Sequence, residues 1–124
     1  MTTNTSPICK HCDDQIVEDL QHALLSCSYN REISQALMDT LSISQPNLSP
    51  SKVLTLSFEV EEEMELPVVW LTTNILQKIW DFRKEKKRCD LVRVRADLEA
   101  RVSLLRESRF SEPAAIISQM LLNL

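Results

Sequence analysis

The chain contains no glycine, and this absence limits both its fold and its chemistry. Walker A phosphate loops and dinucleotide-binding fingerprints need glycine where the backbone approaches a phosphate, so neither is present. Tight primed hairpin turns also depend on glycine. Proline is scarce as well, with 5 residues among 124. Together these shortages favour helices over sheet and predict an all-α fold.

Long apolar runs are also missing, which argues against a membrane protein. The longest uncharged apolar stretch, near LPVVWL, is far shorter than the roughly 20 residues that span a bilayer. The N-terminal MTTNTSPICK has neither the basic region nor the apolar region of a secretory signal. We therefore expect an intracellular protein, nuclear or cytoplasmic, with no membrane partner. In that reducing environment, clustered cysteines are more often metal ligands or catalytic groups than disulfides.

Changes in composition divide the chain into four parts. A short polar tail comes first, then a segment rich in cysteine and histidine, then a polar linker, and finally a long amphipathic region. The predicted parts are a disordered tail at 1–8, a zinc-binding helical segment at 9–42, a linker with a short helix at 43–66, and a helical tail at 67–124 that forms a helical hairpin or long helices.

Helices are expected from apolar periodicity and from capping signals. Ser49 followed by Pro50 marks a helix start, because the serine can cap and the proline suits the first helical position. Asp90 is a second candidate N-cap. The expected helices cover 15–26, 29–42, 50–57, 67 to about 86, 91–105, and a C-terminal stretch that opens at 111–113.

Residues 68–82 carry two apolar stripes, which is usual for a helix buried between neighbours. One stripe is roughly 140° out of phase with the apolar face of 91–105, and this favours a break between 86 and 90. The other stripe is almost in phase, so one long helix stays open as an alternative. Trp80 and Phe82 are expected in the core. The first stripe is Val68, Leu71, Ile75, Ile79 and Phe82, and the second is Val69, Leu76 and Trp80.

Three of the four cysteines and both histidines lie within residues 9–27. Four of these side chains follow the order Cys-x2-Cys-x9-His-x4-Cys, and four such ligands complete a tetrahedral zinc site. A filled shell leaves no position for water, which is typical of a structural site. Zinc would also supply stability that a segment with few large apolar residues lacks. The predicted ligands of Zn²⁺ are Cys9, Cys12, His22 and Cys27.

Other interpretations of these residues are weaker. A Cys-x2-Cys pair alone would suit a redox dithiol, but no βαβ pattern accompanies it. His11 is a competing ligand of low rank, because it is adjacent to Cys12 and would crowd the tetrahedron. Cys89 is distant in the sequence and is expected to be a free thiol or a packing residue.

Positive charge is concentrated in the second half of the chain. Residues 1–70 carry 3 basic and 11 acidic side chains, whereas residues 71–124 carry 11 basic and 7 acidic ones. A basic helical run attracts phosphates, which predicts RNA or DNA binding through the helical tail. The alternative is an ordinary solvated helix face. The candidate nucleic-acid-binding residues are Arg83, Lys84, Lys86, Lys87, Arg88, Arg93 and Arg95.

The segment CKHCDDQIVEDLQHALLSC resembles the zinc-binding region that follows the polymerase domain in non-LTR retrotransposon reverse transcriptases. Downstream, ILQKIWDFRKEKKR and LEARVSLLRESRF resemble the helical C-terminal tail of the same polyproteins. The resemblance implies zinc on the four ligands given above and binding of element RNA or target DNA. Asp13 departs from the pattern, because the family often has glycine at this position.

The sequence therefore predicts a non-catalytic zinc-binding module that binds nucleic acid and resembles the C-terminal end of a reverse transcriptase polyprotein. The alternative is a structural or protein-interaction domain in which zinc only stabilises the fold. In that case helix 68–82 contacts a protein partner or a second copy of the chain. An enzyme is the least favoured class. Polymerase and endonuclease motifs are missing, and neither histidine has a serine or cysteine partner at catalytic spacing.

Overall fold

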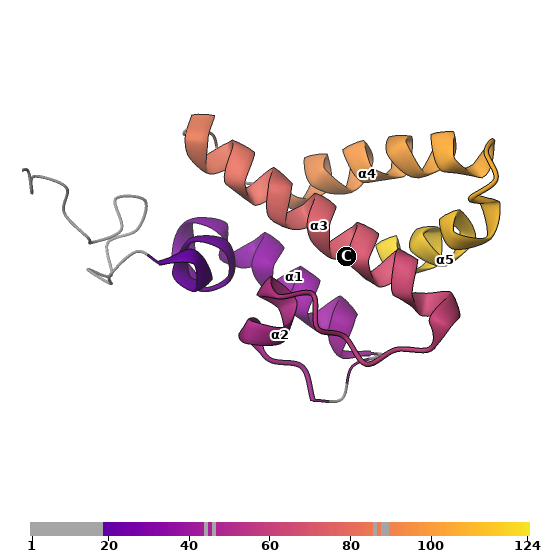
Figure 1. Ribbon diagram of the computed structural model, residues 1–124. Coiled ribbons are helices and arrows are strands. Elements are labelled where there is room, and N and C mark those ends of the chain that lie inside the picture. Colours follow the sequence, from indigo (N-terminus) through magenta and orange to yellow (C-terminus); the bar gives the residue numbers. More distant parts are fainter. Residues whose placement is uncertain (1–18, 44, 46, 86, 88–89) are drawn as a thin grey trace, which may run out of the picture.

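The computed structural model describes residues 19–124 apart from 44, 46, 86 and 88–89, and it is built from helices (Figure 1). No strand occurs in this part of the chain, which confirms the all-α prediction. The tail predicted at 1–8 lies outside the described residues. The elements are a π-helical turn η1 (His22–Ser26), a 3₁₀ turn η2 (Ser28–Asn30), α1 (Arg31–Ser42), α2 (Pro50–Leu54), α3 (Glu62–Glu85), α4 (Leu91–Arg106) and α5 (Ser111–Leu121).

The long helix α3 runs through the middle of the molecule (Figure 1). On one side, α4 and α5 pack against each other and against α3, and on the other side α1 and η1 contact it. All of these elements share one apolar core, so η1 and α1 fold onto the helices of the second half of the chain. The largest fully buried side chains are Ile33, Leu37, Leu41, Val53, Val68, Leu71, Ile75, Ile79, Val94, Leu98, Ile117 and Leu121.

Helix α3 begins at Glu62, whereas the sequence predicted a start at Pro67. Its first turn carries Glu62, Glu63 and Glu65, and negative charge at this end interacts favourably with the helix dipole. Pro67 therefore lies inside the helix, where its ring is buried. Its missing N–H leaves one carbonyl of the preceding turn without a helical partner. That carbonyl belongs to the exposed Glu63, so water can satisfy it.

The predicted break between 86 and 90 is confirmed, because α3 ends at Glu85 and α4 begins at Leu91. Asp90 caps α4 as expected. Its Oδ1 accepts a hydrogen bond from the N–H of Val92 at 3.0 Å. The single-helix alternative for this region is therefore wrong.

Helix α2 starts as predicted and ends earlier than predicted. Oγ of Ser49 accepts a hydrogen bond from the N–H of Lys52 at 3.3 Å, and Pro50 occupies the first helical position. The helix ends at Leu54 rather than near 57.

Leu56 ends α2 in a left-handed conformation, with φ of 56°. The N–H of Ser57 donates to the carbonyl of Lys52 at 2.9 Å, and the N–H of Leu56 donates to the carbonyl of Val53 at 3.3 Å. This pair of bonds forms a Schellman motif, in which glycine usually occupies the left-handed position. A leucine there costs roughly 1–2 kcal/mol, because its Cβ crowds the following carbonyl. The chain has no glycine to relieve this strain.

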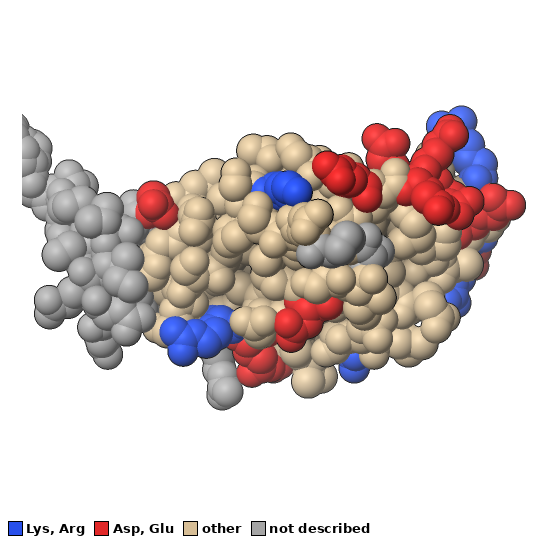
Figure 2. All heavy atoms as spheres, turned by 90° about the horizontal axis from the view of Figure 1, so that it is seen from below, with Lys and Arg blue, Asp and Glu red and all other residues tan. Residues whose placement is uncertain are grey.

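Charge is distributed unevenly over the surface (Figure 2). On the face seen from below in Figure 1, most atoms belong to uncharged residues. Asp and Glu gather toward the end of the molecule at which α3 begins. The exposed acidic residues just before and within the first turns of α3 are Glu59, Glu61, Glu62, Glu63 and Glu65.

Candidate functional site

The first described segment forms one helical turn that contains two of the four predicted zinc ligands. The N–H of His22 donates to Oδ1 of Asp19 at 2.7 Å, so Asp19 caps the turn. The N–H of Cys27 donates to the carbonyl of His22 at 2.7 Å, and this bond across five residues defines the π-turn η1. The helix predicted over 15–26 is thus present at its C-terminal end, and 15–18 lie outside the described residues.

The π-turn brings His22 and Cys27 toward the same side of the backbone. In a regular α-helix, positions five apart differ by about 140° around the axis. A π-turn holds one more residue per hydrogen-bonded ring, so the same separation comes closer to one full turn. Both residues are buried, with His22 exposed by 3% and Cys27 by 0%. The two candidate ligands therefore belong to one backbone hydrogen-bonded ring and are both shielded from solvent.

The other two predicted ligands, Cys9 and Cys12, lie outside the described residues, as do His11 and Cys89. Within residues 19–124, where they are described, no three side chains of His, Cys, Asp or Glu gather closely enough to hold a metal ion. His22 and Cys27 are thus the described half of the candidate metal centre.

A buried polar network supports η1. Oγ of Ser34 donates to the carbonyl of Leu24 at 2.9 Å, and Nδ2 of Asn30 donates to Oγ of Ser34 at 2.8 Å. From α3, Nη1 of Arg83 donates to Oδ1 of Asn30 at 3.1 Å. Carbonyls at the end of a helical turn have no partner inside it, so this network satisfies one of them. It also ties the turn to both α1 and α3.

The position of Arg83 corrects the prediction for the basic run. The sequence suggested that Arg83 contacts nucleic acid, but the residue is only 3% exposed and its guanidinium bonds inside the protein. The reason is periodicity, because Ile75, Ile79 and Arg83 follow one another at intervals of four along a buried stripe of α3. The spacing that predicts burial of the two isoleucines also applies to the arginine.

Arg95 likewise serves the fold. Its Nε and Nη2 donate to the carbonyl of Leu121 at 3.2 and 3.1 Å, and Nη2 also donates to the carbonyl of Leu122 at 3.3 Å. A cation at the end of α5 satisfies its last carbonyls and interacts favourably with the helix dipole. Of the remaining candidate residues, Lys86 and Arg88 lie outside the described part of the chain.

Three of the candidate phosphate-binding cations are exposed. Nζ of Lys84 lies 3.9 Å from a carboxylate oxygen of Asp81, and Nζ of Lys87 lies 3.1 Å from one of Glu85. Arg93 is exposed on α4. Acidic neighbours thus offset part of the positive charge that the sequence assigned to a nucleic-acid surface.

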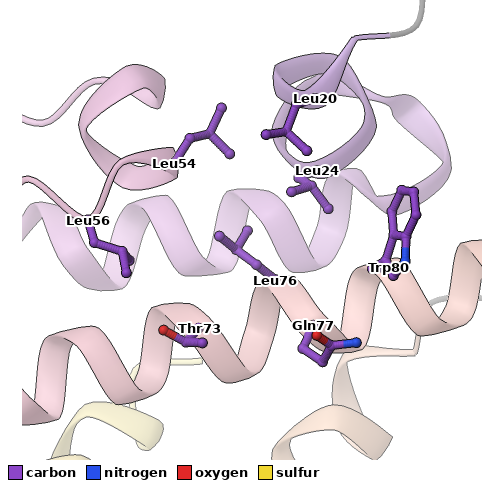
Figure 3. A pocket seen from close by; sticks show the side chains of 8 residues that line it. All are labelled: Leu20, Leu24, Leu54, Leu56, Thr73, Leu76, Gln77 and Trp80. Carbon is purple, nitrogen blue, oxygen red and sulfur yellow. The ribbon is translucent and has the colours of Figure 1, made fainter.

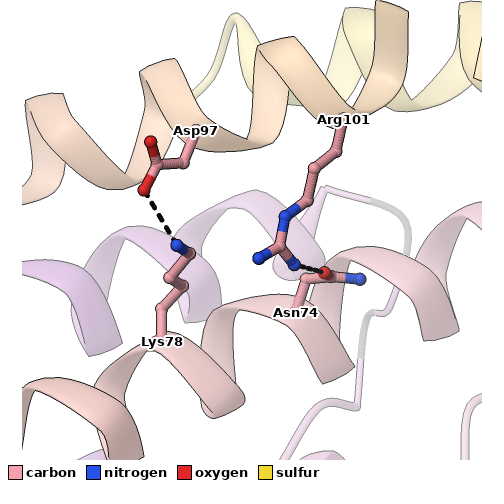
Figure 4. A network of polar contacts seen from close by, with 4 residues as sticks. All are labelled: Asn74, Lys78, Asp97 and Arg101. Atoms are coloured by element: carbon pink, nitrogen blue, oxygen red, sulfur yellow. Dashed lines mark hydrogen bonds and ion pairs between the residues drawn. The ribbon is translucent and has the colours of Figure 1, made fainter. Parts of the chain in front are cut away.

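Two polar contacts join α3 to α4 (Figure 4). Nζ of Lys78 lies 2.8 Å from Oδ2 of Asp97, and Nη1 of Arg101 donates to Oδ1 of Asn74 at 2.6 Å. The hydrogen bond and the positive charge of Lys78 hold the pKa of Asp97 below its ordinary value. Arg101 is thus a further cation of the second half of the chain that is exposed but donates a hydrogen bond to a neighbouring helix.

An open apolar groove, here called the leucine groove, lies between η1, α2 and α3 (Figure 3). Its volume is about 330 Å³. Trp80 lines it and is 44% exposed, which corrects the prediction that this residue belongs to the core. Phe82 is partly buried against the core. The residues that line the groove are Leu20, Leu24, Leu54, Leu56, Thr73, Leu76, Gln77 and Trp80.

Comparison of the chain with protein-family models, curated proteins and solved structures finds no match. The resemblance to reverse transcriptases therefore stays a prediction that rests on the residues quoted above. In the described part of the chain, no helix combines the length and the apolar character needed to cross a bilayer.

The buried network predicts unequal roles for two adjacent cations. Arg83→Met keeps much of the side-chain volume but leaves Oδ1 of Asn30 without this donor, so we expect a loss of about 2–3 kcal/mol in the free energy of unfolding. Lys84→Met, on the exposed side of the same turn, should change it by less than about 0.5 kcal/mol. Urea denaturation of both variants measures this difference. Equal effects would show that the Arg83–Asn30 bond contributes little.

The Lys78–Asp97 ion pair predicts a pH dependence. Because the folded state lowers the pKa of Asp97, the pair stabilises the protein above the unfolded-state pKa of about 3.9. This contribution is lost as pH falls through the folded-state pKa. Asp97→Asn should cost at most about 1 kcal/mol at pH 7, since the pair is solvent-exposed, and nothing in strong acid. A carboxyl NMR titration that gives Asp97 an ordinary or raised pKa would contradict this prediction.

Proposed function

We propose that this chain is a non-catalytic, zinc-stabilised helical module whose function is to bind another protein. One observation carries the proposal. A single short segment, residues 20–27, contributes His22 and Cys27 to the interior and Leu20 and Leu24 to the wall of the leucine groove. A metal ion bound on the inner side of this segment would fix the position of the apolar wall on the outer side.

The proposed ligands are Cys9, Cys12, His22 and Cys27. The sequence spacing supports this set, and so does the π-turn whose backbone hydrogen bond joins His22 and Cys27. Three thiolates and one imidazole would fill a tetrahedral zinc shell, with no open position for water. Zinc would therefore supply folding free energy and no catalysis. The same proposal retains the resemblance to the zinc-binding region of non-LTR retrotransposon reverse transcriptases.

Protein binding is favoured over nucleic-acid binding because most of the candidate basic residues interact with other groups of the protein. Arg83 and Arg95 donate their hydrogen bonds inside the fold, and Lys84 and Lys87 lie beside carboxylates. A phosphate-binding face needs several uncompensated cations together. The leucine groove, in contrast, offers adjoining apolar side chains to solvent, which is typical of a protein-interaction site.

The metal proposal predicts one zinc ion per chain. Cys27→Ser should weaken zinc binding by more than about 100-fold, because removal of a ligand costs more than removal of an outer-shell partner. Cys9→Ser, which changes no residue of the described core, should weaken it similarly. Cys89→Ser is the matched control and should bind zinc normally. Native mass spectrometry and a competition titration with a chelator measure stoichiometry and affinity. Metal-free protein from cells, or equal loss in Cys89→Ser, would contradict the assignment.

Nucleic-acid binding is the second candidate function. The net positive charge of residues 71–124 favours it, together with the exposed positions of Lys84, Lys87 and Arg93. Binding would be mainly to phosphates, because few of these side chains can discriminate bases.

This second function predicts a steep dependence on salt. The logarithm of the affinity should fall against the logarithm of salt concentration with a slope of about 0.7–0.9 per phosphate contact. Changing Lys84, Lys87 and Arg93 together to Gln should flatten the slope, whereas Arg31→Gln on α1 should not. Fluorescence anisotropy with labelled RNA and DNA measures both. Absence of binding at about 50 mM salt would leave protein interaction as the function.

A further inference from the structure

We propose that the leucine groove binds one amphipathic α-helix of a partner protein, and that this helix carries basic residues at one end and acidic residues at the other. This inference rests on the proposed function of protein binding and specifies both its site and its partner. Three independent features of the groove support it: its lining, the strained backbone at Leu56, and the charges at its two ends.

The lining of the groove is almost wholly apolar. Five leucines and Trp80 provide the apolar surface, and the other two lining residues are Thr73 and Gln77. Oγ1 of Thr73 donates to the carbonyl of Val69 at 2.6 Å, and Nε2 of Gln77 donates to Asp81 at 3.0 Å. Hydrogen bonds within α3 therefore use the hydroxyl proton of Thr73 and one amide proton of Gln77. Such a wall suits the leucine or isoleucine side chains of a helix at i, i+3, i+4 and i+7.

Leu56 links backbone strain to this surface. Its side chain lines the groove and is 39% exposed, yet its backbone has a left-handed conformation that glycine would adopt with less strain. The side chain is not needed to fill the core, because it is absent from the buried cluster. Backbone strain is found more often at functional sites than elsewhere, so a strained residue that lines an open groove points to a function there. We infer that the leucine side chain is there for contact with a ligand.

The charges at the two ends of the groove predict which charges the ligand helix carries at its own ends. Glu62, Glu65, Thr73, Trp80 and Lys84 share one face of α3 by helical periodicity. At 1.5 Å per residue, Lys84 lies about 6 Å beyond Trp80, and Glu65 lies about 12 Å before Thr73. All three charged residues are exposed, and the Asp81 carboxylate lies 3.9 Å from the Lys84 ammonium group, at the outer limit of an ion pair. A helix in the groove would therefore meet carboxylates at one end and an ammonium group at the other.

The test uses the full zinc-loaded chain and three labelled peptides of about 20 residues with identical leucine positions. The first has arginines at one end and glutamates at the other, the second has arginines at both ends, and the third has glutamates at both ends. We expect the first to bind at least tenfold more tightly than the others. Lys84→Glu should transfer this preference to the second peptide. Arg93→Glu, the same charge change on α4, should preserve the original ranking.

Leu56→Gly and Leu56→Asn separate binding from folding. Both residues tolerate the left-handed conformation, so the variants should fold at least as stably as the parent chain while losing at least fivefold in peptide affinity. Ile43→Asn, at a residue that is 71% exposed and outside the groove lining, should leave the affinity unchanged. Full affinity in both Leu56 variants, or equal binding of the three peptides, would overturn the proposal. So would a dimer of the chain that Leu56→Asn dissociates, because a second copy would then fill the groove.

Zinc content is measured in the same samples, so failure of this proposal is distinct from failure of the metal proposal. Stoichiometric zinc without peptide binding overturns the groove as a docking site and leaves the metal centre standing. Undiminished peptide binding by metal-free chain supports the groove and contradicts the stabilising role of zinc.

Discussion

Arg83 donates a hydrogen bond to Asn30 across 53 positions of sequence, inside the protein, and this bond ties α3 to the turn that precedes α1. Asn30 and Ser34 use their other groups to bind each other and the carbonyl of Leu24, which closes the end of η1. The phenol of Tyr29 also donates to the carbonyl of Lys87, so a second bond joins the same regions. A buried guanidinium is costly without hydrogen-bond partners, and the side-chain oxygen of Asn30 provides one. Arg83, the first residue of the basic run, therefore stabilises the fold.

The segment from Leu20 to Cys27 contains both described candidate metal ligands and residues that line the leucine groove. Its inner face carries the two described candidate ligands, and its outer face forms one wall of the leucine groove. The π-turn closes one hydrogen-bonded ring from His22 to Cys27, and Leu20 and Leu24 of the same segment line the groove. Metal binding and partner binding would then be linked through one rigid turn, and each would strengthen the other by the same factor.

The helices could be predicted largely from the sequence, because apolar spacing and capping residues are local signals. The break before Leu91 and the caps at Ser49 and Asp90 follow from them. Which side chains are covered depends on packing between elements, and local signals do not give this. Trp80 has the periodicity of a core residue but faces a groove, since no element of the described chain covers that side of α3. The left-handed Leu56 could not be predicted, because leucine carries no signal for that conformation. Partner residues far apart in sequence, such as Arg83 and Asn30, likewise give no local pattern.

X-ray absorption at the zinc edge of the purified, zinc-loaded chain tests most directly whether the turn at His22 and Cys27 belongs to a metal centre. Three cysteine ligands and one histidine ligand predict about three sulfur atoms near 2.3 Å and one nitrogen near 2.0–2.1 Å from the metal. Cys27→Ser should remove one sulfur from that shell, and Cys89→Ser should leave it unchanged. A shell of oxygen and nitrogen alone, or one that Cys27→Ser does not alter, would contradict the assignment.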